Sequence, residues 1–181
     1  MFFQTTITAF LYEDRDRESQ SYTHPIRVMF TEDQGETWED AIVADSLATV
    51  RFRKIDLIDD SFGYVIMTAD RTMSSELTLV YKTTDGGRTW TEMSRPDTTR
   101  LVHDGTFLDQ ERGFLSYGTI NPTEPSLYYT EDGGGNWTEA EVDIPEEYAG
   151  IFVQADMPFI DGDQLLMHVN QGTIGDYKGG W

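Results

Sequence analysis

Short runs of alternating apolar and polar residues dominate the chain. In residues 77–82 (LTLVYK) apolar or aromatic side chains recur at every second position, with β-forming residues on both faces, which is typical of a strand. Residues 64–67 (YVIM) and 114–117 (FLSY) are short β-forming runs bounded by glycine or aspartate. No segment carries a sustained apolar stripe at helical spacing with capping residues. The pattern predicts an all-β protein.

An eight-residue phrase, the octet, occurs three times. It reads TEDQGETW at 31–38, TTDGGRTW at 83–90 and TEDGGGNW at 130–137. An apolar pair stands just before each octet, as Val28-Met29, Val80-Tyr81 and Leu127-Tyr128. Successive octets are roughly 50 residues apart, which is the length of a four-stranded propeller blade.

A second phrase, two apolar residues followed by aspartate, recurs with the same period. It occurs as Leu57-Ile58-Asp59, Phe107-Leu108-Asp109 and Phe159-Ile160-Asp161, and the first two are followed by Gly63-Tyr64 and Gly113-Phe114. Two independent landmarks with one period indicate a structural repeat. In each repeat we expect strand A to end at this phrase, strand B to begin at the Gly-aromatic pair, strand C to run into the octet and strand D to begin at its tryptophan.

The octet predicts a hairpin turn between strands C and D. Its aspartate is expected to accept hydrogen bonds from backbone N–H groups about two residues further on. One glycine is expected to supply a positive φ, and the tryptophan to bury its ring against neighbouring strands. The residues assigned these structural roles are Thr31, Asp33, Gly35, Trp38, Thr83, Asp85, Gly87, Trp90, Thr130, Asp132, Gly134 and Trp137.

The octet resembles the Asp-box, or BNR repeat, Ser/Thr-x-Asp-x-Gly-x-Thr-Trp. That family includes sialidases, sortilin-type receptors, photosystem assembly factors and many bacterial surface proteins. The first two octets match in full, and the third has Asn136 in place of threonine. The resemblance covers roughly residues 20–170 and implies a β-propeller of four-stranded antiparallel blades.

The landmarks divide the chain into three to four blades. Residues 1–43 supply strands B to D of a first blade, 44–93 a second, 94–143 a third, and 144–181 the start of a fourth. Propellers of this family usually have six or more blades, so we expect these residues to be part of a larger ring. Open blade edges expose unpaired backbone groups, and we therefore expect a tendency to self-association.

Composition narrows the range of partners. The net charge of −20 repels nucleic-acid phosphates and anionic membrane surfaces, so neither is expected as a partner. The chain has no cysteine, which excludes disulfides and thiolate chemistry. Its first residues, MFFQTTITAF, do not read as a signal peptide, and no apolar stretch approaches the length of a bilayer span.

The sequence predicts no catalytic, cofactor-binding or metal-binding residue. Resemblance to sialidases would imply three arginines clamping a carboxylate, but Pro25-Ile26-Arg27 reverses the family's Arg-Ile-Pro phrase and no spacing selects a triad from Arg51, Arg53 and Arg100. The acidic loops lack calcium-loop spacing. His24, His103 and His168 lack metal-ligand spacing.

Two long loops between strands B and C, at 13–25 and 121–126, are candidate binding segments. We expect a non-enzymatic binding or scaffolding module of an exported or cell-surface protein, located outside the cytoplasm. The resemblance implies a protein or glycan ligand on the face away from the octets. The alternative is a sialidase-like glycoside hydrolase whose active site is completed by further chain, and a third reading is an assembly factor.

Overall fold

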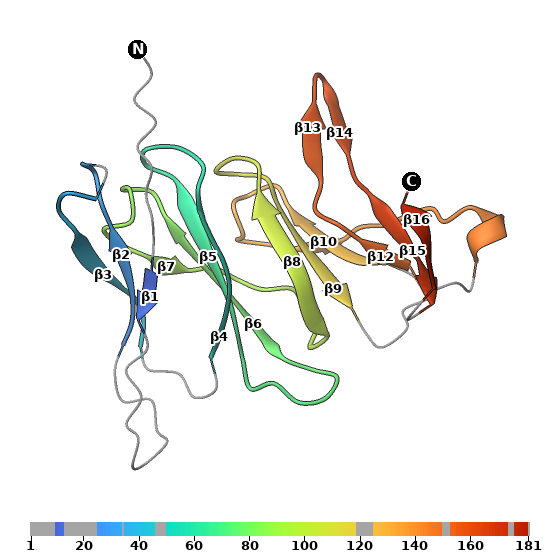
Figure 1. The fold of residues 1–181 in the computed structure, drawn as a ribbon, viewed down its shortest axis with the longest axis horizontal. Coiled ribbons are helices and arrows are strands. Elements are labelled where there is room, and N and C mark those ends of the chain that lie inside the picture. Colours follow the sequence, from blue (N-terminus) through green and yellow to red (C-terminus); the bar gives the residue numbers. More distant parts are fainter. Residues whose placement is uncertain are drawn as a thin grey trace. The chain divides into compact units, whose positions relative to one another are not determined.

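The structure, a computed structural model, describes residues 10–12, 25–33, 35–45, 50–118, 125–149, 153–173 and 176–180. Within these ranges the regular structure is β-strand apart from one 3-10 turn, η1 (Glu146–Tyr148), so the all-β prediction is confirmed (Figure 1). The chain forms two compact units, one of Met1–Asp70 with Leu79–Met93 and the other of Arg71–Thr78 with Ser94–Trp181. His24, loop residues 13–24 and most of loop 121–126 lie outside the described residues.

The first unit begins with a three-stranded antiparallel sheet in the order β1-β2-β3. Its strands are β1 (Phe10–Tyr12), β2 (Ile26–Phe30) and β3 (Glu39–Ala44). Along β2 every second side chain, Ile26, Val28 and Phe30, is buried, which is the period expected of a strand with one face on the core.

A four-stranded sheet in the order β4-β5-β6-β7 follows. Its strands are β4 (Arg51–Leu57), β5 (Gly63–Ala69), β6 (Leu77–Thr83) and β7 (Thr91–Glu92). Strand β5 is buried on both faces, and Tyr64 is fully enclosed. β5 begins at the Gly-aromatic pair, β6 runs into the octet, and β7 begins one residue after Trp90, so the predicted A-B-C-D order is confirmed.

The second unit contains the equivalent four-stranded sheet, β8-β9-β10-β11. Its strands are β8 (Leu101–Phe107), β9 (Gly113–Gly118), β10 (Ser126–Thr130) and β11 (Thr138–Glu139). Val102, Phe107, Leu115, Tyr117 and Leu127 form its buried apolar core. β9 pairs antiparallel with both β8 and β10, and β10 pairs antiparallel with β11.

The Gly-aromatic landmark has a packing explanation. Gly63 pairs across the sheet with Leu57, and Gly113 pairs with Phe107, so each glycine faces the first apolar residue of the preceding phrase. A Cβ on Gly63 would lie 2.4 Å from Leu57 Cδ2 and 2.7 Å from the Asp56 carbonyl oxygen. A Cβ on Gly113 would lie 2.6 Å from the Phe107 ring. Strand B therefore begins with glycine because the last apolar side chain of strand A, Leu57 or Phe107, occupies the space of its Cβ.

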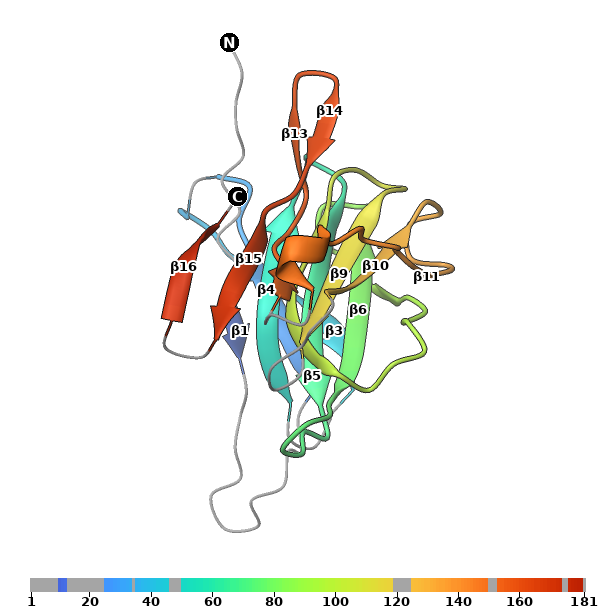
Figure 2. The same ribbon diagram turned by 90° about the vertical axis from the view of Figure 1, so that its right-hand side faces the viewer.

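The C-terminal strands differ from the repeat. A three-stranded sheet, β12-β15-β16, is accompanied by a two-stranded hairpin, β13-β14. The strands are β12 (Val153–Ala155), β13 (Phe159–Asp161), β14 (Gln164–Leu166), β15 (Val169–Thr173) and β16 (Asp176–Gly180). In both views of the ribbon the hairpin extends beyond the ends of β12 and β15 (Figures 1 and 2).

The third apolar-apolar-Asp phrase does not end a strand in the way the first two do. Asp59 Oδ1 accepts from the N–H groups of Ser61 and Phe62, and Asp109 Oδ1 accepts from those of Glu111 and Arg112. Asp161 instead pairs with Gln164 across a two-residue turn whose Gly162 has φ +61°. Such a tight turn leaves no loop of the length that Asp59 and Asp109 close.

Candidate functional site

The octets are the most conspicuous polar clusters, and the structure places each in a turn. In the first, Asp33 Oδ1 accepts from Thr37 N–H at 2.7 Å and from Thr31 Oγ1 at 2.8 Å, while Oδ2 accepts from Thr37 Oγ1 at 2.5 Å. Thr31 Oγ1 accepts in turn from Gly35 N–H at 2.9 Å. Both carboxylate oxygens are therefore engaged by donors of the same turn.

The other two turns repeat these contacts. Asp85 accepts from Thr89 N–H at 2.9 Å, and Asp132 accepts from Asn136 N–H at 2.8 Å. Asn136 Nδ2 donates to Asp132 Oδ2 at 2.7 Å, where the other turns use a threonine hydroxyl. The departure at Asn136 is thus neutral for the turn, because an amide N–H replaces a hydroxyl donor.

The backbone details correct one expectation and confirm another. The N–H bound by each aspartate Oδ1 lies four residues further on, whereas about two was expected, because the glycine curls the intervening backbone around the carboxylate. The positive φ is confirmed at Gly35 (+93°), Gly87 (+94°) and Gly134 (+91°). A residue with a Cβ would adopt these angles only at a cost.

These contacts fix the protonation state of the turn carboxylates. The pKa of Asp33, Asp85 and Asp132 is lowered to about 2, chiefly by the side-chain donors Thr37, Thr89 and Asn136 respectively. Hydrogen bonds to the ionised form favour it over the acid. At neutral pH these groups carry no proton to give, and a general acid must carry one.

The prediction that the tryptophans bury their rings against neighbouring strands is met only in part. Trp38 is 37% exposed, and Trp90 and Trp137 are half-buried. Trp38 Nε1 donates to Gly35 O and Trp90 Nε1 to Gly87 O, and in each case the ring lies 3.8 Å from where a Cβ on that glycine would stand. The indole lies over its own turn because its N–H finds a free carbonyl there, and burial in the apolar core would leave that donor unpaired.

Trp137 has a different acceptor. Its Nε1 donates to Ser94 O at 3.0 Å, and its ring meets the buried Phe107 edge to face at 6.1 Å. Ser94 Oγ donates to the carbonyls of Gly134 and Gly135. The third turn is therefore fastened to the segment before β8, within the second unit.

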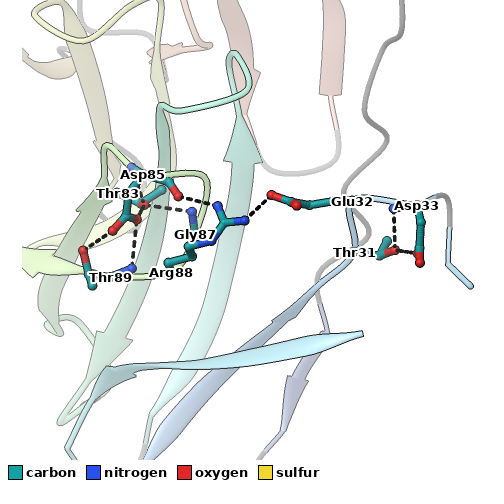
Figure 3. Close-up of polar contacts among 8 residues, drawn as sticks. All are labelled: Thr31, Glu32, Asp33, Thr83, Asp85, Gly87, Arg88 and Thr89. Carbon is teal, nitrogen blue, oxygen red and sulfur yellow. Dashed lines mark hydrogen bonds and ion pairs between the residues drawn. The ribbon is translucent and has the colours of Figure 1, made fainter. Parts of the chain in front are cut away.

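In the first unit an ion pair links two octet turns. Arg88, in the second octet, pairs with Glu32 in the first, and its Nη1 also donates to Asp85 O at 3.0 Å (Figure 3). Its guanidinium lies 5.7 Å from the centre of the Phe30 ring. Arg88 thus joins successive turns by charge and by a cation–π contact.

The Arg88–Glu32 pair is expected to couple weakly, because both side chains are about half exposed. In a double-mutant cycle of Arg88→Ala and Glu32→Ala, urea unfolding at low salt should give a small favourable coupling energy. That coupling should vanish at about 1 M salt, where the screening length falls to about 3 Å. A coupling that survives high salt would show that Arg88 and Glu32 interact by more than a screened surface ion pair; the Arg88–Phe30 contact does not enter this coupling, because it is lost equally with and without Glu32.

The first turn borders an open hollow of about 210 Å³ lined by Phe30, Thr31, Glu32, Asp33, Thr37 and Glu39. Its acidic lining would favour a cation. However, the Asp33 oxygens already accept from Thr31 and Thr37, and Glu32 is paired with Arg88. Within the described ranges no group of three or more His, Asp or Glu side chains is placed to hold a metal ion.

The second unit contains a largely buried polar cluster that the sequence did not predict. It consists of Glu76, Thr78, Tyr117 and Tyr128 and is called the tyrosine cluster below. Tyr117 Oη donates to Thr78 Oγ1 at 3.0 Å, and the Tyr117 and Tyr128 rings meet edge to face at 5.5 Å. Glu76, 2% exposed, accepts from Val102 N–H through Oε1 at 2.7 Å. No periodicity marks Glu76, because it precedes β6 in a polar loop whose burial only the tertiary structure decides.

Resemblance to sialidases would also imply a nucleophilic Tyr–Glu pair, so the contacts of the tyrosines bear on the hydrolase alternative. In the first unit Tyr81 Oη donates to Glu92 Oε2 at 3.1 Å. In the second unit the candidate is the tyrosine cluster. Burial raises the pKa of Tyr117 well above its usual value, and desolvation also raises the pKa of Tyr128. Both phenols therefore remain protonated at neutral pH. Tyr117 Oη donates to the Thr78 hydroxyl, while Glu76 Oε1 accepts from the backbone N–H of Val102. The contacts of Tyr117 and Glu76 are those of a buried structural network.

The remaining candidate side chains lie at the surface. Arg51, Arg53 and Arg100 are all exposed. His103 Nε2 lies 3.5 Å from Asp156 Oδ1, and the His168 ring meets Phe159 edge to face at 5.8 Å. Along the part of the chain that the structure describes, no helix is long and apolar enough to cross a membrane.

The sequence was compared with protein-family models and with curated proteins. No protein-family model matches the sequence, and none of the curated proteins matches it. Functional inference therefore depends on the geometry of this chain.

Proposed function

We propose that this chain is a non-enzymatic binding or scaffolding module built of Asp-box β-propeller blades, with a protein or a glycan as ligand. The observation that carries the proposal is the engagement of the repeated carboxylates. In Asp33, Asp85 and Asp132 both carboxylate oxygens accept hydrogen bonds from donors of the same turn. The pKa of each of these carboxyl groups is about 2. Their role is to hold hairpins in shape, which leaves a rigid scaffold.

The repetition of the sheets supports the blade assignment. In both four-stranded sheets strand A faces a glycine at the start of strand B, and strand C enters an octet turn. The edge strands of such sheets carry unpaired backbone groups that can recruit another strand, and we include self-association through open blade edges in the proposal. Export to the cell surface remains part of the proposal on the resemblance alone.

The enzyme hypothesis and the binding-module hypothesis predict opposite results in a turnover assay and in a binding assay. The purified chain, incubated with a panel of fluorogenic glycosides that includes a sialoside, is expected to release no fluorophore above a heat-denatured sample. A known sialidase in parallel wells shows that the panel works. The folded chain, but not the heated sample, should bind saturably to at least one member of a glycan array or of a displayed protein library. Turnover by the folded chain would establish the glycoside hydrolase alternative and end the proposal.

A further inference from the structure

The β13-β14 hairpin exposes large apolar side chains on both of its faces. Phe159 pairs with Leu166 and Ile160 with Leu165. Directly opposed residues share a face and consecutive residues point to opposite faces, so each face carries one apolar pair. The exposed fractions are 43% for Phe159, 37% for Leu166, 52% for Ile160 and 51% for Leu165.

This exposure is unusual for so small an element. Single exposed apolar side chains are normal, but contiguous ones mark interaction sites. A two-stranded hairpin is at best marginally stable in water without a covered face. In the described ranges no third strand pairs with β13 or β14, and the hairpin projects past its neighbouring strands in both views (Figures 1 and 2).

The two faces are not equivalent. On one face Phe159 already meets the His168 ring edge to face at 5.8 Å. The Ile160–Leu165 pair on the other face is about half exposed at both positions. The Ile160–Leu165 face is therefore the better site for another polypeptide.

The charge around the hairpin indicates the kind of partner. Asp161 and Asp163 are exposed at its tip. Between Arg112 and Lys178 the sequence contains no lysine or arginine, while acidic residues are frequent there. The self-association proposed above uses blade edges, whereas at this hairpin a second copy would bring its own exposed aspartates close to Asp161 and Asp163, and like charges repel. A basic partner would be attracted, and its positive side chains could pair with the aspartates.

We propose that the β13-β14 hairpin docks an extended, basic polypeptide segment in which aliphatic residues alternate with lysine or arginine. The segment adds as a third strand to an edge of the hairpin, places its aliphatic side chains on the face that carries Ile160 and Leu165, and places its cations on the opposite face, which carries Asp161. Strand addition supplies main-chain hydrogen bonds, and alternation puts the two kinds of side chain on opposite faces. This inference rests on the proposed function, since it names a class of partner for a binding module.

The test uses the full chain and three short fluorescent peptides. One alternates lysine and valine, one has the same composition with all lysines before all valines, and one alternates glutamate and valine. Fluorescence anisotropy should show saturable binding of the first peptide, weak binding of the second and none of the third. Absence of saturable binding by the first peptide, or equal binding of the first two, overturns the inference.

Variants locate the binding site. Ile160→Ser/Leu165→Ser keeps the net charge and is expected to weaken binding of the alternating peptide at least about tenfold. Asp161→Asn/Asp163→Asn should weaken it less and reduce its salt dependence. The matched control is Met73→Ser, which removes a side chain that is 87% exposed elsewhere in the second unit and should leave binding unchanged. Unchanged thermal unfolding of all variants shows that they fold.

The outcomes separate this inference from the proposed function. If the serine variant binds the peptide as the wild type does, the hairpin is not the docking site, and the glycan or protein binding of the wild type is untouched. If the wild type hydrolyses glycosides, the proposed function fails whatever the hairpin binds.

Discussion

Replacing Gly63 with alanine is expected to lower the free energy of unfolding by about 2–3 kcal/mol, the cost of forcing an atom into a filled core. The new Cβ would lie 2.4 Å from Leu57 Cδ2 and 2.7 Å from the Asp56 carbonyl oxygen. The leucine could turn aside, but the carbonyl belongs to β4, which pairs with β5 through this region. Relief therefore requires separation of the two strands where strand A meets strand B.

The matched control is Gly118→Ala at the end of β9. Gly118 has no heavy atom within 4 Å of the Cβ position, so this variant should stay within about 0.5 kcal/mol of the wild type. Urea denaturation followed by tryptophan fluorescence measures both. Equal stability of Gly63→Ala and Gly118→Ala would show that β4 and β5 separate at little cost, and would remove the packing explanation of the Gly-aromatic landmark.

The same collision explains why the strand order could be predicted from sequence. Gly63 and Gly113 recur because Leu57 and Phe107 occupy equivalent positions across the sheet, and a steric requirement repeated in space leaves a repeated residue in the sequence. The octet is predictable for the same kind of reason, since carboxylate, hydroxyl and positive-φ glycine must stand at fixed offsets to satisfy one another. Local geometry of this kind is visible in a single sequence.

Features that depend on distant partners were not predictable. Glu76 is buried and accepts a hydrogen bond from the Val102 N–H, 26 residues further along the chain. No residue near Glu76 in the sequence indicates this contact. The tryptophans were expected to pack against neighbouring strands because large rings usually favour burial, yet the indole N–H groups of Trp38 and Trp90 donate to carbonyls of their own turns. The third apolar-apolar-Asp phrase matches the first two in composition, but its two apolar residues are exposed in β13.

Replacing Asp85 with alanine is expected to destabilise the first unit by about 2 kcal/mol, since charged side-chain acceptors of backbone N–H groups contribute on this scale. The substitution removes the acceptor for Thr89 N–H, Thr89 Oγ1 and Thr83 Oγ1 together. Asp85→Asn should cost less, because the amide oxygen can still accept from Thr89 N–H. Asp143→Ala is the control, as it removes an equal charge from an exposed position and should change stability by at most about 0.5 kcal/mol.

The pH dependence distinguishes loss of the carboxylate from general damage to the turn. The pKa of Asp85 is about 2 in the folded chain and 3.8 in the ordinary state. The unfolded chain therefore binds more protons around and between these values, and the stabilisation from Asp85 is complete above pH about 5 and is lost as pH falls through 2. Asp85→Ala should unfold with a shallower dependence on pH in this window. Part of the dependence of the unfolding free energy on pH remains in this variant, because the pKa values of Asp33 and Asp132 are also about 2. If the slope were the same in Asp85→Ala and wild type, the turn would be held by its backbone and glycines, and the hydrogen bonds of its carboxylate would contribute nothing to folding.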